Sequence, residues 1–208
     1  MNGPLQKDLV ILVADKNMEF AVRGLLSRAE SLGARRPEVD VYVHPERDPG
    51  CLLRGHEFLR HFVNTYRHAL LMFDREGCGQ ETVTRAQLES SVETQLSQSG
   101  WQNRATVIVF DPELEVWVWS DSPHVDEALG WSGRQPDLRT WLVTVGCSVN
   151  KTAKPARPKE AVCKALKLAR KPRSSSTYLQ LAERVSLARC VDPAFHKFTT
   201  TLLRWFPS

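Results

Sequence analysis

Ala69-Leu-Leu-Met-Phe-Asp-Arg-Glu-Gly-Cys-Gly79 is the most informative stretch of this chain. A short apolar run ends abruptly in two acids, Asp74 and Glu76, and two glycines follow closely. An apolar run of this length, bounded by glycine, predicts a buried strand over residues 69–73. Because alternate side chains of a strand point to the same face, we expect Asp74 and Glu76 to lie together at its carboxyl end.

Paired carboxylates at such a position favour a metal site. Two neighbouring carboxylates repel each other unless a proton or a cation lies between them. Mg²⁺ and Mn²⁺ prefer carboxylate oxygens, and open parallel sheets place their sites outside the carboxyl ends of the strands. We therefore predict that Asp74 and Glu76 bind a divalent cation, Mg²⁺ or Mn²⁺.

Segments on both sides of this stretch alternate between strand-like and helix-like patterns. Short, mostly apolar segments predict further strands over residues 9–14, 39–43 and 106–110. Amphipathic patterns between them predict helices, the first closed by Gly33 and the third spanning residues 80–98. This alternation predicts an α/β fold, in which helices flank a mainly parallel sheet.

The alternation stops after residue 110. Asp111-Pro112 has the residue types of an N-cap and a first helical position, which predicts a helix over residues 113–121. We expect an irregular segment to follow as far as residue 136, and then a strand over residues 140–145.

Three helices are predicted from Pro158 onward, and the last starts at a second Asp-Pro pair, Asp192-Pro193. The chain therefore divides into an α/β core, residues 1–121, and a second part, residues 122–208. The second part combines the irregular segment with a helical extension that packs on the core.

Acidic residues follow other predicted strands as well. Asp15 comes after the first strand, and Glu113 and Glu115 come after the fourth. In a doubly wound sheet these three would gather with Asp74 and Glu76 at one edge. Asp15 also suits the simpler role of a helix N-cap, and Glu113 that of a first-turn acid favoured by the helix dipole.

The net charge of +4 is unevenly distributed. Residues 151–173 carry many lysines and arginines against a single acid, Glu160. Such a region suits the phosphates of nucleic acid, although a solvated linker and helix face would have the same composition. The candidate nucleic-acid-binding residues are Lys151, Lys154, Lys164, Lys167, Lys171 and Arg173.

Composition excludes several classes of protein. The 208 residues are 42% apolar and 25% charged, which is typical of a globular domain and not of a disordered chain. No run approaches the roughly 20 apolar residues of a membrane span, and the first residues lack a signal-peptide pattern. Five scattered cysteines without a C-x-x-C pair disfavour a zinc site or a disulfide framework. We expect a cytoplasmic protein without membrane contact.

Four segments, in this order, resemble the small bacterial Toprim-like proteins of the DUF4276 type, which are related to nuclease-like Toprim proteins of phage-defence islands. LVILVADKNMEF (9–20) is similar to the family's opening strand and turn, with Glu19 at the acid before the helix. ALLMFDREGCG (69–79) resembles its Asp-x-Asp strand end. VIVFDPELEVWVWSD (107–121) resembles its Glu-x-Trp-x-x-x-Asp segment. The stretch from PKEAVCKAL (158–166) to YLQLAERVSLARCVDPAFHKFTTTL (178–202) looks like its closing Lys-Glu, Tyr, Ala and Phe pattern.

This resemblance implies a Toprim-like (Rossmann-like) fold and metal-dependent phosphodiester hydrolysis of nucleic acid. It further implies a role in bacterial antiviral defence, in a methylation-associated system with other defence proteins as partners. Asp74 and Glu76 would hold the metal, and Glu113, Glu115 or Asp15 would complete its shell. Asp74, Glu76, Glu115 and Asp15 form the implied catalytic set.

Two positions depart from the family pattern. Ala14 stands where the family has a first-strand Glu, thought to be a general acid/base, and Asp15 lies beside it. The second acid of Asp-x-Asp is Glu76. The missing Glu leaves an alternative open: a catalytically inactive Toprim-like module that binds DNA or partner proteins in a defence complex.

Overall fold

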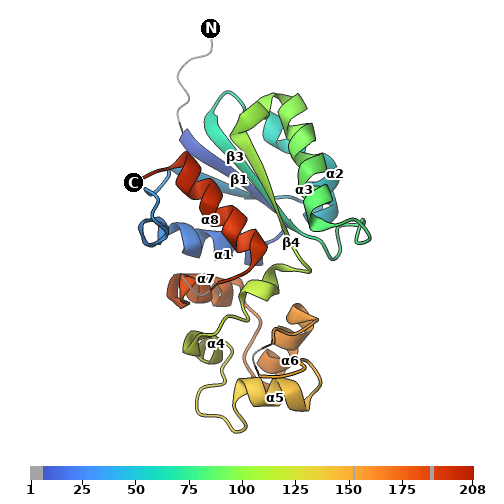
Figure 1. Cartoon of the computed structure of the whole chain (residues 1–208), viewed down its shortest axis with the longest axis vertical. Helices are drawn as coiled ribbons and strands as arrows, with labels where there is room; N and C mark the ends of the chain where they lie inside the picture. Colours follow the sequence, from blue (N-terminus) through green and yellow to red (C-terminus); the bar gives the residue numbers. More distant parts are fainter. Residues whose placement is uncertain (1–6, 152, 188–189) are drawn as a thin grey trace.

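The computed structural model describes residues 7–151, 153–187 and 190–208. Its centre is one sheet of four parallel strands in the order β2-β1-β3-β4 (Figure 1). Val13 pairs with Met72 across β1 and β3, and Asp74 pairs with Phe110 across β3 and β4. The predicted α/β fold with a parallel sheet is confirmed. Its strands are β1 (Lys7–Val13), β2 (Val39–Val43), β3 (Tyr66–Asp74) and β4 (Ala105–Phe110).

Helices cover both faces of this sheet (Figure 1). The chain moves one way across the sheet from β1 to β2, and the other way from β2 through β3 to β4. Because parallel crossovers are right-handed, α1 (Lys16–Leu26) lies on one face, and α2 (Arg47–Arg60) and α3 (Arg85–Leu96) lie on the other. The direction changes between β1 and β3, where open sheets of this kind commonly bind ligands.

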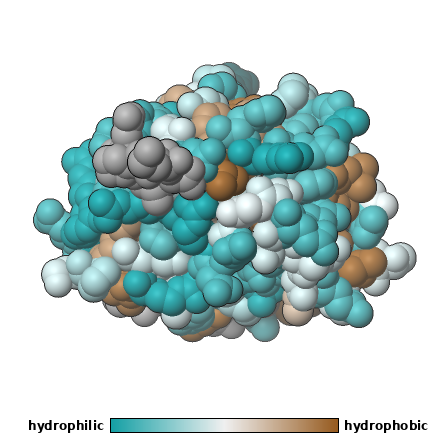
Figure 2. All heavy atoms as spheres, turned by 90° about the horizontal axis from the view of Figure 1, so that it is seen from above, coloured by the Kyte–Doolittle hydropathy of each residue, from teal (hydrophilic) through white to brown (hydrophobic). Residues whose placement is uncertain are grey.

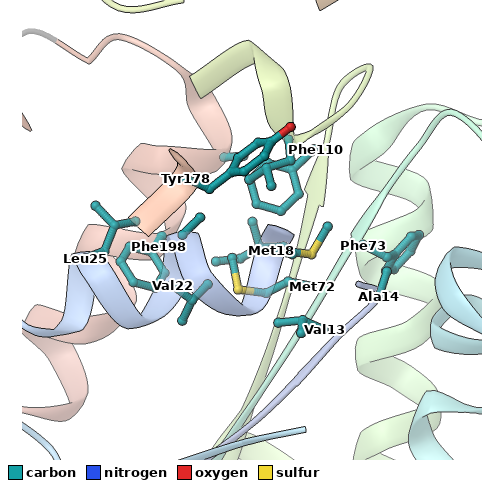
Figure 3. Packing of buried hydrophobic residues seen from close by; sticks show 14 of the residues in the cluster. Val13, Ala14, Met18, Val22, Leu25, Met72, Phe73, Phe110, Tyr178 and Phe198 are labelled. Atoms are coloured by element: carbon teal, nitrogen blue, oxygen red, sulfur yellow. The ribbon is translucent and has the colours of Figure 1, made fainter. Parts of the chain in front are cut away.

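The core is continuous between the sheet and the helices on the α1 side. Met18 and Val22 of α1, Met72 of β3 and Phe198 of α8 (Pro193–Trp205) point toward one another (Figure 3). Tyr178 adds its ring to the same cluster. The final helix therefore belongs to the layer that covers the sheet, although it is the last element of the chain.

The remaining helices lie beyond the carboxyl edge of the sheet (Figure 1). The helix α7 (Ser175–Arg184) packs along α1, and the contact is close because residue 24 is glycine. A Cβ atom on Gly24 would lie 2.7 Å from the Cβ of Ala182 and 2.9 Å from the carbonyl oxygen of Leu179. The other elements here are the 3₁₀ turn η4 (Leu114–Trp117), α4 (Pro123–Ala128), α5 (Leu138–Thr144) and α6 (Pro158–Ala169).

Carboxylates cover the outer edge of β4. The backbone N–H of Val107 donates to Oε1 of Glu93 at 3.0 Å, and that of Val109 donates to Oε1 of Glu89 at 3.0 Å. Lys197 of α8 binds both acids, at 3.1 Å to Glu89 and 2.8 Å to Glu93. Two edge N–H groups that would otherwise be free for another strand are thereby satisfied.

The predicted strand over residues 140–145 is wrong, because these residues belong to α5. The Asp137 side chain caps this helix by accepting the N–H of Thr140 at 2.9 Å. Leu138 and Leu142, four positions apart, are its buried residues, whereas Val143 is exposed. Burial at helical spacing outweighs the high strand propensity of the segment.

The segment after β4 also differs from the prediction. Asp111 does not cap a helix over residues 113–121; its carboxylate accepts a hydrogen bond of 2.8 Å from Nε of Arg75. Only the short turn η4 forms, after Glu113, and α4 forms within the segment expected to be irregular. The three helices from Pro158 onward are confirmed, and Asp192 caps α8 by accepting the N–H groups of Ala194 and Phe195.

The surface at the amino-terminal edge of the sheet is mostly hydrophilic, with small separate apolar patches (Figure 2). Within the described ranges, no helix has both the length and the apolar character needed to cross a membrane. The first six residues, part of the region where we expected no signal-peptide pattern, lie outside the described residues.

Candidate metal centre

Three buried acids meet at the carboxyl edge of the sheet. Asp74 is the last residue of β3, and Glu113 and Glu115 stand on either side of Leu114, just after β4. Because β3 and β4 are parallel neighbours, their ends bring these acids together. One carboxylate oxygen of each lies within 4.8 Å of the others, and the side chains are almost inaccessible to solvent. We call Asp74, Glu113 and Glu115 the acid group.

Asp74 is fixed by backbone hydrogen bonds. Its Oδ1 accepts the N–H of Leu114 at 2.8 Å, and its own N–H donates to Oδ1 of Asp48 at 2.8 Å. Burial raises the pKa of the Asp74 carboxyl well above its usual range, and the nearby charges of Asp48 and Glu115 raise it further. An ionised Asp74 therefore needs a positive charge close by.

Glu115 is held by two side chains from the C-terminal part of the chain. The hydroxyl of Tyr178 donates to its Oε1 at 2.5 Å, and Nη2 of Arg173 lies 3.4 Å from the same oxygen. Burial raises the pKa of Glu115, although the Tyr178 hydrogen bond and the charge of Lys159 oppose the shift. Burial, followed by the charge of Glu115, also raises the pKa of Tyr178, so its hydroxyl remains a donor.

Lys159 is the second cation beside the acid group, after Arg173. Its backbone N–H donates to Oε1 of Glu113 at 3.0 Å, and its Nζ lies 3.4 Å from Oε2 of the same residue. Burial disfavours the ammonium charge, but the carboxylates of Glu115, Asp74 and Glu113 outweigh it and raise the pKa of Lys159. One lysine offsets only part of the charge of three carboxylates.

The donor set fits a hard cation. Oδ2 of Asp74 and Oε2 of Glu115 accept no hydrogen bond from the described residues, so an oxygen of each remains free for a ligand bond. Carboxylate oxygens are the preferred protein ligands of Mg²⁺ and Mn²⁺. The acid group is therefore placed so that it can hold a metal ion.

Glu76 is not a member of this group. It is exposed, and its backbone N–H donates to the carbonyl oxygen of Pro112 at 2.9 Å. The strand ends at Asp74, and Gly77 adopts a left-handed conformation shortly afterwards. The same-face rule that predicted an Asp74–Glu76 pair applies only within an extended strand, so the pair does not form.

Two other acids named by the sequence have partners of their own. Asp15 caps α1, because its Oδ1 accepts the N–H of Met18 at 2.9 Å; the simpler of the two roles predicted for it is confirmed. Its charge still contributes to raising the pKa of Asp48, after burial. Glu19 is buried and paired with Lys16 at 2.7 Å and with Arg23 at 3.0 Å.

The basic candidates of residues 151–173 are dispersed, and most are engaged. Nζ of Lys154 donates to the carbonyl oxygen of Val116 at 2.8 Å, and Nζ of Lys171 donates to that of Ala128 at 2.6 Å. These two lysines tie the segments around α4 and α6 together. The others are Lys151 (paired with Asp137), Lys164 (paired with Glu160), Lys167 (exposed) and Arg173 (beside Glu115).

Sequence reasoning did not name Lys159, Tyr178 or Asp48 as site residues. Lys159 lies in the basic region of residues 151–173, and Tyr178 lies in one of the predicted helices. Both occur in the closing Lys-Glu and Tyr pattern of the resembled family, which was the available signal. Asp48 stands in a loop-like Asp-Pro-Gly sequence and gives no comparable signal.

Comparisons with known proteins add no relative: no family model, no curated protein and no solved structure matches this chain.

Proposed function

We propose that this chain is a Toprim-like, divalent-metal-dependent nuclease that hydrolyses phosphodiesters of nucleic acid in bacterial antiviral defence. The carrying observation is the acid group: three buried carboxylates with oxygens within 4.8 Å of one another at the carboxyl edge of a parallel sheet. The sequence resemblance supports the defence role and the nucleic-acid substrate. Asp74 and Glu113 would hold Mg²⁺ or Mn²⁺, and Glu115 would lie beside the ion with its Oε2 free.

A divalent ion at this position would polarise a phosphoryl oxygen and lower the pKa of a bound water. The chain's own residues do the rest. The N–H of Leu114 holds one oxygen of Asp74, and the hydroxyl of Tyr178 holds one oxygen of Glu115. Each hydrogen bond thereby fixes the orientation of the carboxylate and of its second oxygen. Lys159, which lies 3.4 Å from Glu113, would add a positive charge beside the reacting phosphate.

Glu115 is the proposed general base. A carboxylate with a raised pKa is a stronger base than an exposed one. Its Oε2 accepts no hydrogen bond from the described residues, so this atom can take the proton of the attacking water. The family's first-strand Glu is replaced by Ala14, and Glu115 would take over its role in proton transfer.

The test is cleavage of single- and double-stranded DNA and RNA in Mg²⁺ or Mn²⁺. Replacing Asp74 by Asn together with Glu113 by Gln removes two negative charges at nearly constant shape, and should lower the rate on the order of 100-fold or more. The matched control is Glu57→Gln, an exposed acid of α2 outside the acid group. Equal activity of the double variant and the control would reject the proposal.

Lys159 favours the second candidate, the inactive module that binds DNA or partner proteins. Its ammonium already offsets part of the charge of the acid group, as a structural substitute for a cation would. Calorimetry with Mn²⁺ separates the two functions. The nuclease requires saturable uptake that is lost in the double variant, whereas the module requires neither uptake nor cleavage.

A further inference from the structure

A polar pocket lies at the same edge of the sheet as the acid group, on the β2 side. Its volume is about 430 Å³. It is lined by residues that follow β1 and β2, by the first turn of α1, and by Arg47 and Arg173. No member of the acid group lines it, but Arg173 joins the two places, because its Nη2 lies 3.4 Å from Oε1 of Glu115.

His44 presents an unpaired donor in this pocket. The residue is 5% exposed, and its Nδ1 accepts the N–H of Glu46 at 3.1 Å. The ring proton therefore lies on Nε2, which has no partner among the described residues. The ring is held in place: Phe58 contacts it, and a Cβ atom on Gly50 would lie 2.2 Å from Nδ1. Burial, and then the charge of Arg54, lowers the pKa of His44, so the ring is neutral at pH 7.

The cations around the pocket are not equivalent. Lys16 is paired with Glu19, and Arg173 with Glu115. The guanidinium of Arg47 forms no ion pair or hydrogen bond within the described part of the chain, and the residue is exposed. Asp15 also lines the pocket, but its carboxylate caps α1. The pocket thus has a free guanidinium and a free imidazole N–H, with a single acid that is already engaged.

The N-terminus of α1 lies at the pocket, and the N-terminus of α7 lies beside that of α1. Gly24 of α1 touches α7 at Ala182, and seven residues earlier the Ser175 hydroxyl of α7 hydrogen-bonds Oδ1 of Asn17 at 2.8 Å. The two helices therefore run in the same direction, with their first turns side by side. Lys16 and Asn17, the first residues of α1, line the pocket. First-turn N–H groups of helices carry partial positive charge and bind anions.

We propose that this pocket binds a phosphate group of a nucleic-acid strand, next to the phosphate that the acid group would cleave. The position of this phosphate next to a cleaved one rests on the proposed function, whereas phosphate binding itself does not. The Arg47 guanidinium and the His44 Nε2–H are its direct donors, and Arg173 connects the bound phosphate with Glu115. Arg47 matches phosphate geometry with two N–H groups, which a lysine cannot do.

In the first experiment, the full-length protein is titrated with inorganic phosphate in EDTA and low salt, and binding is measured by calorimetry. Saturable binding is expected, and Arg47→Ala should weaken it at least about 10-fold, since hydrogen bonds to charged groups are strong. Arg60→Ala is the matched control, because it removes an exposed arginine from the far end of the same helix. Absence of saturable binding, or equal losses in the two variants, would overturn the proposal.

A second arm identifies the source of the phosphate. Binding of 5′-phosphorylated and 5′-hydroxyl single-stranded oligonucleotides is measured in EDTA with the same variants. If Arg47→Ala weakens binding of both oligonucleotides, the pocket binds a backbone phosphate. If it weakens binding of the 5′-phosphorylated oligonucleotide alone, the pocket binds a terminal phosphate. Either result supports the proposal. Weakened binding of inorganic phosphate alone would overturn the nucleic-acid assignment.

The acid group is not needed for either titration. The Asp74→Asn, Glu113→Gln double variant should therefore bind inorganic phosphate as tightly as the unaltered chain, even if no nuclease activity is found. Failure of the nuclease proposal and failure of the phosphate site can thus be told apart.

Discussion

Tyr178 donates a hydrogen bond of 2.5 Å to Glu115 across 63 positions of sequence. It connects α7 to the end of β4, and both residues are buried. The hydroxyl satisfies a carboxylate that would otherwise lack a donor other than the more distant Arg173. The contacts that hold the acid group therefore affect both the stability of the protein and any metal binding.

Tyr178→Phe should destabilise the protein by about 1–3 kcal/mol, because it leaves a buried carboxylate short of a donor. It should also shift the acidic limb of the pH–rate profile of any nuclease activity to higher pH, because this hydrogen bond lowers the pKa of Glu115, the proposed general base. Urea unfolding and a pH–rate profile check the two effects. A change in stability below about 0.5 kcal/mol would mean that the bond contributes nothing beyond its replacement by water.

The contribution of Asp74 to the stability of the metal-free protein should fall as pH rises above the ordinary Asp pKa of 3.8. The pKa of Asp74 is raised in the folded state, so the folded protein binds more protons than the unfolded chain in this window. Asp74→Asn should flatten this decline. Thermal unfolding of both proteins between acid and neutral pH, in EDTA, measures it; an equally steep decline in the variant would contradict the assignment.

Adding Mg²⁺ or Mn²⁺ at neutral pH should reverse this penalty. At 100 times its dissociation constant, a single bound ion raises the free energy of unfolding by about 2.7 kcal/mol, or roughly 5–10 °C in Tm for a chain of this size. The Asp74→Asn, Glu113→Gln double variant should show no such rise. Glu57→Gln should respond like the unaltered protein.

Glu76→Gln tests whether Glu76 is a metal ligand, as the same-face rule for strands predicts, or lies outside the site, as in the structure. The rule makes Glu76 a metal ligand. Replacing a ligand should weaken Mn²⁺ binding by about tenfold or more, since even changes to residues that support ligands have effects of this size. The structure places Glu76 outside the acid group and exposed, so we expect an affinity within about twofold of the unaltered chain. Parallel calorimetry of Glu76→Gln and Glu113→Gln decides the matter.

Gly24→Ala should destabilise the protein, although alanine is the better helix former. The added Cβ would lie 2.9 Å from a backbone oxygen of α7, so α1 and α7 must move apart. Overpacking of this kind costs about 1–3 kcal/mol. Ser91→Ala, at an exposed position of α3, is a control in which helix propensity acts alone. Equal stability changes in the two variants would refute the close contact.

Local sequence determined the four strands, because each is a short, mostly apolar segment bounded by polar or turn residues. It misled over residues 140–145, where Trp141, Val143 and Val145 suggest a strand. The local signals for the helix are the Asp137 N-cap and the four-residue spacing of Leu138 and Leu142. Burial of these two leucines, which is a tertiary property, selects the helix over the strand.

The site was predictable to the same extent. Asp74, Glu113 and Glu115 each follow a recognisable strand, so parallel order alone brings them near one edge. The partner assignment was not predictable, because Lys159 and Tyr178 reach the acid group from helices far along the chain. The position of Glu76 depends on where β3 ends. Because the strand ends at Asp74, the side chain of Glu76 does not share the face of Asp74 and is exposed.

The carboxylates along β4 bear on how this protein can associate. A strand added at that border would have to displace Glu89 and Glu93 from Val109 and Val107, and so release Lys197 as well. Of the four described strands, β2 forms the opposite border, with β1 as its only neighbour in the sheet. A sheet with one sealed border can join a second copy only through the other, so association of this kind ends at a pair and does not propagate into a fibre.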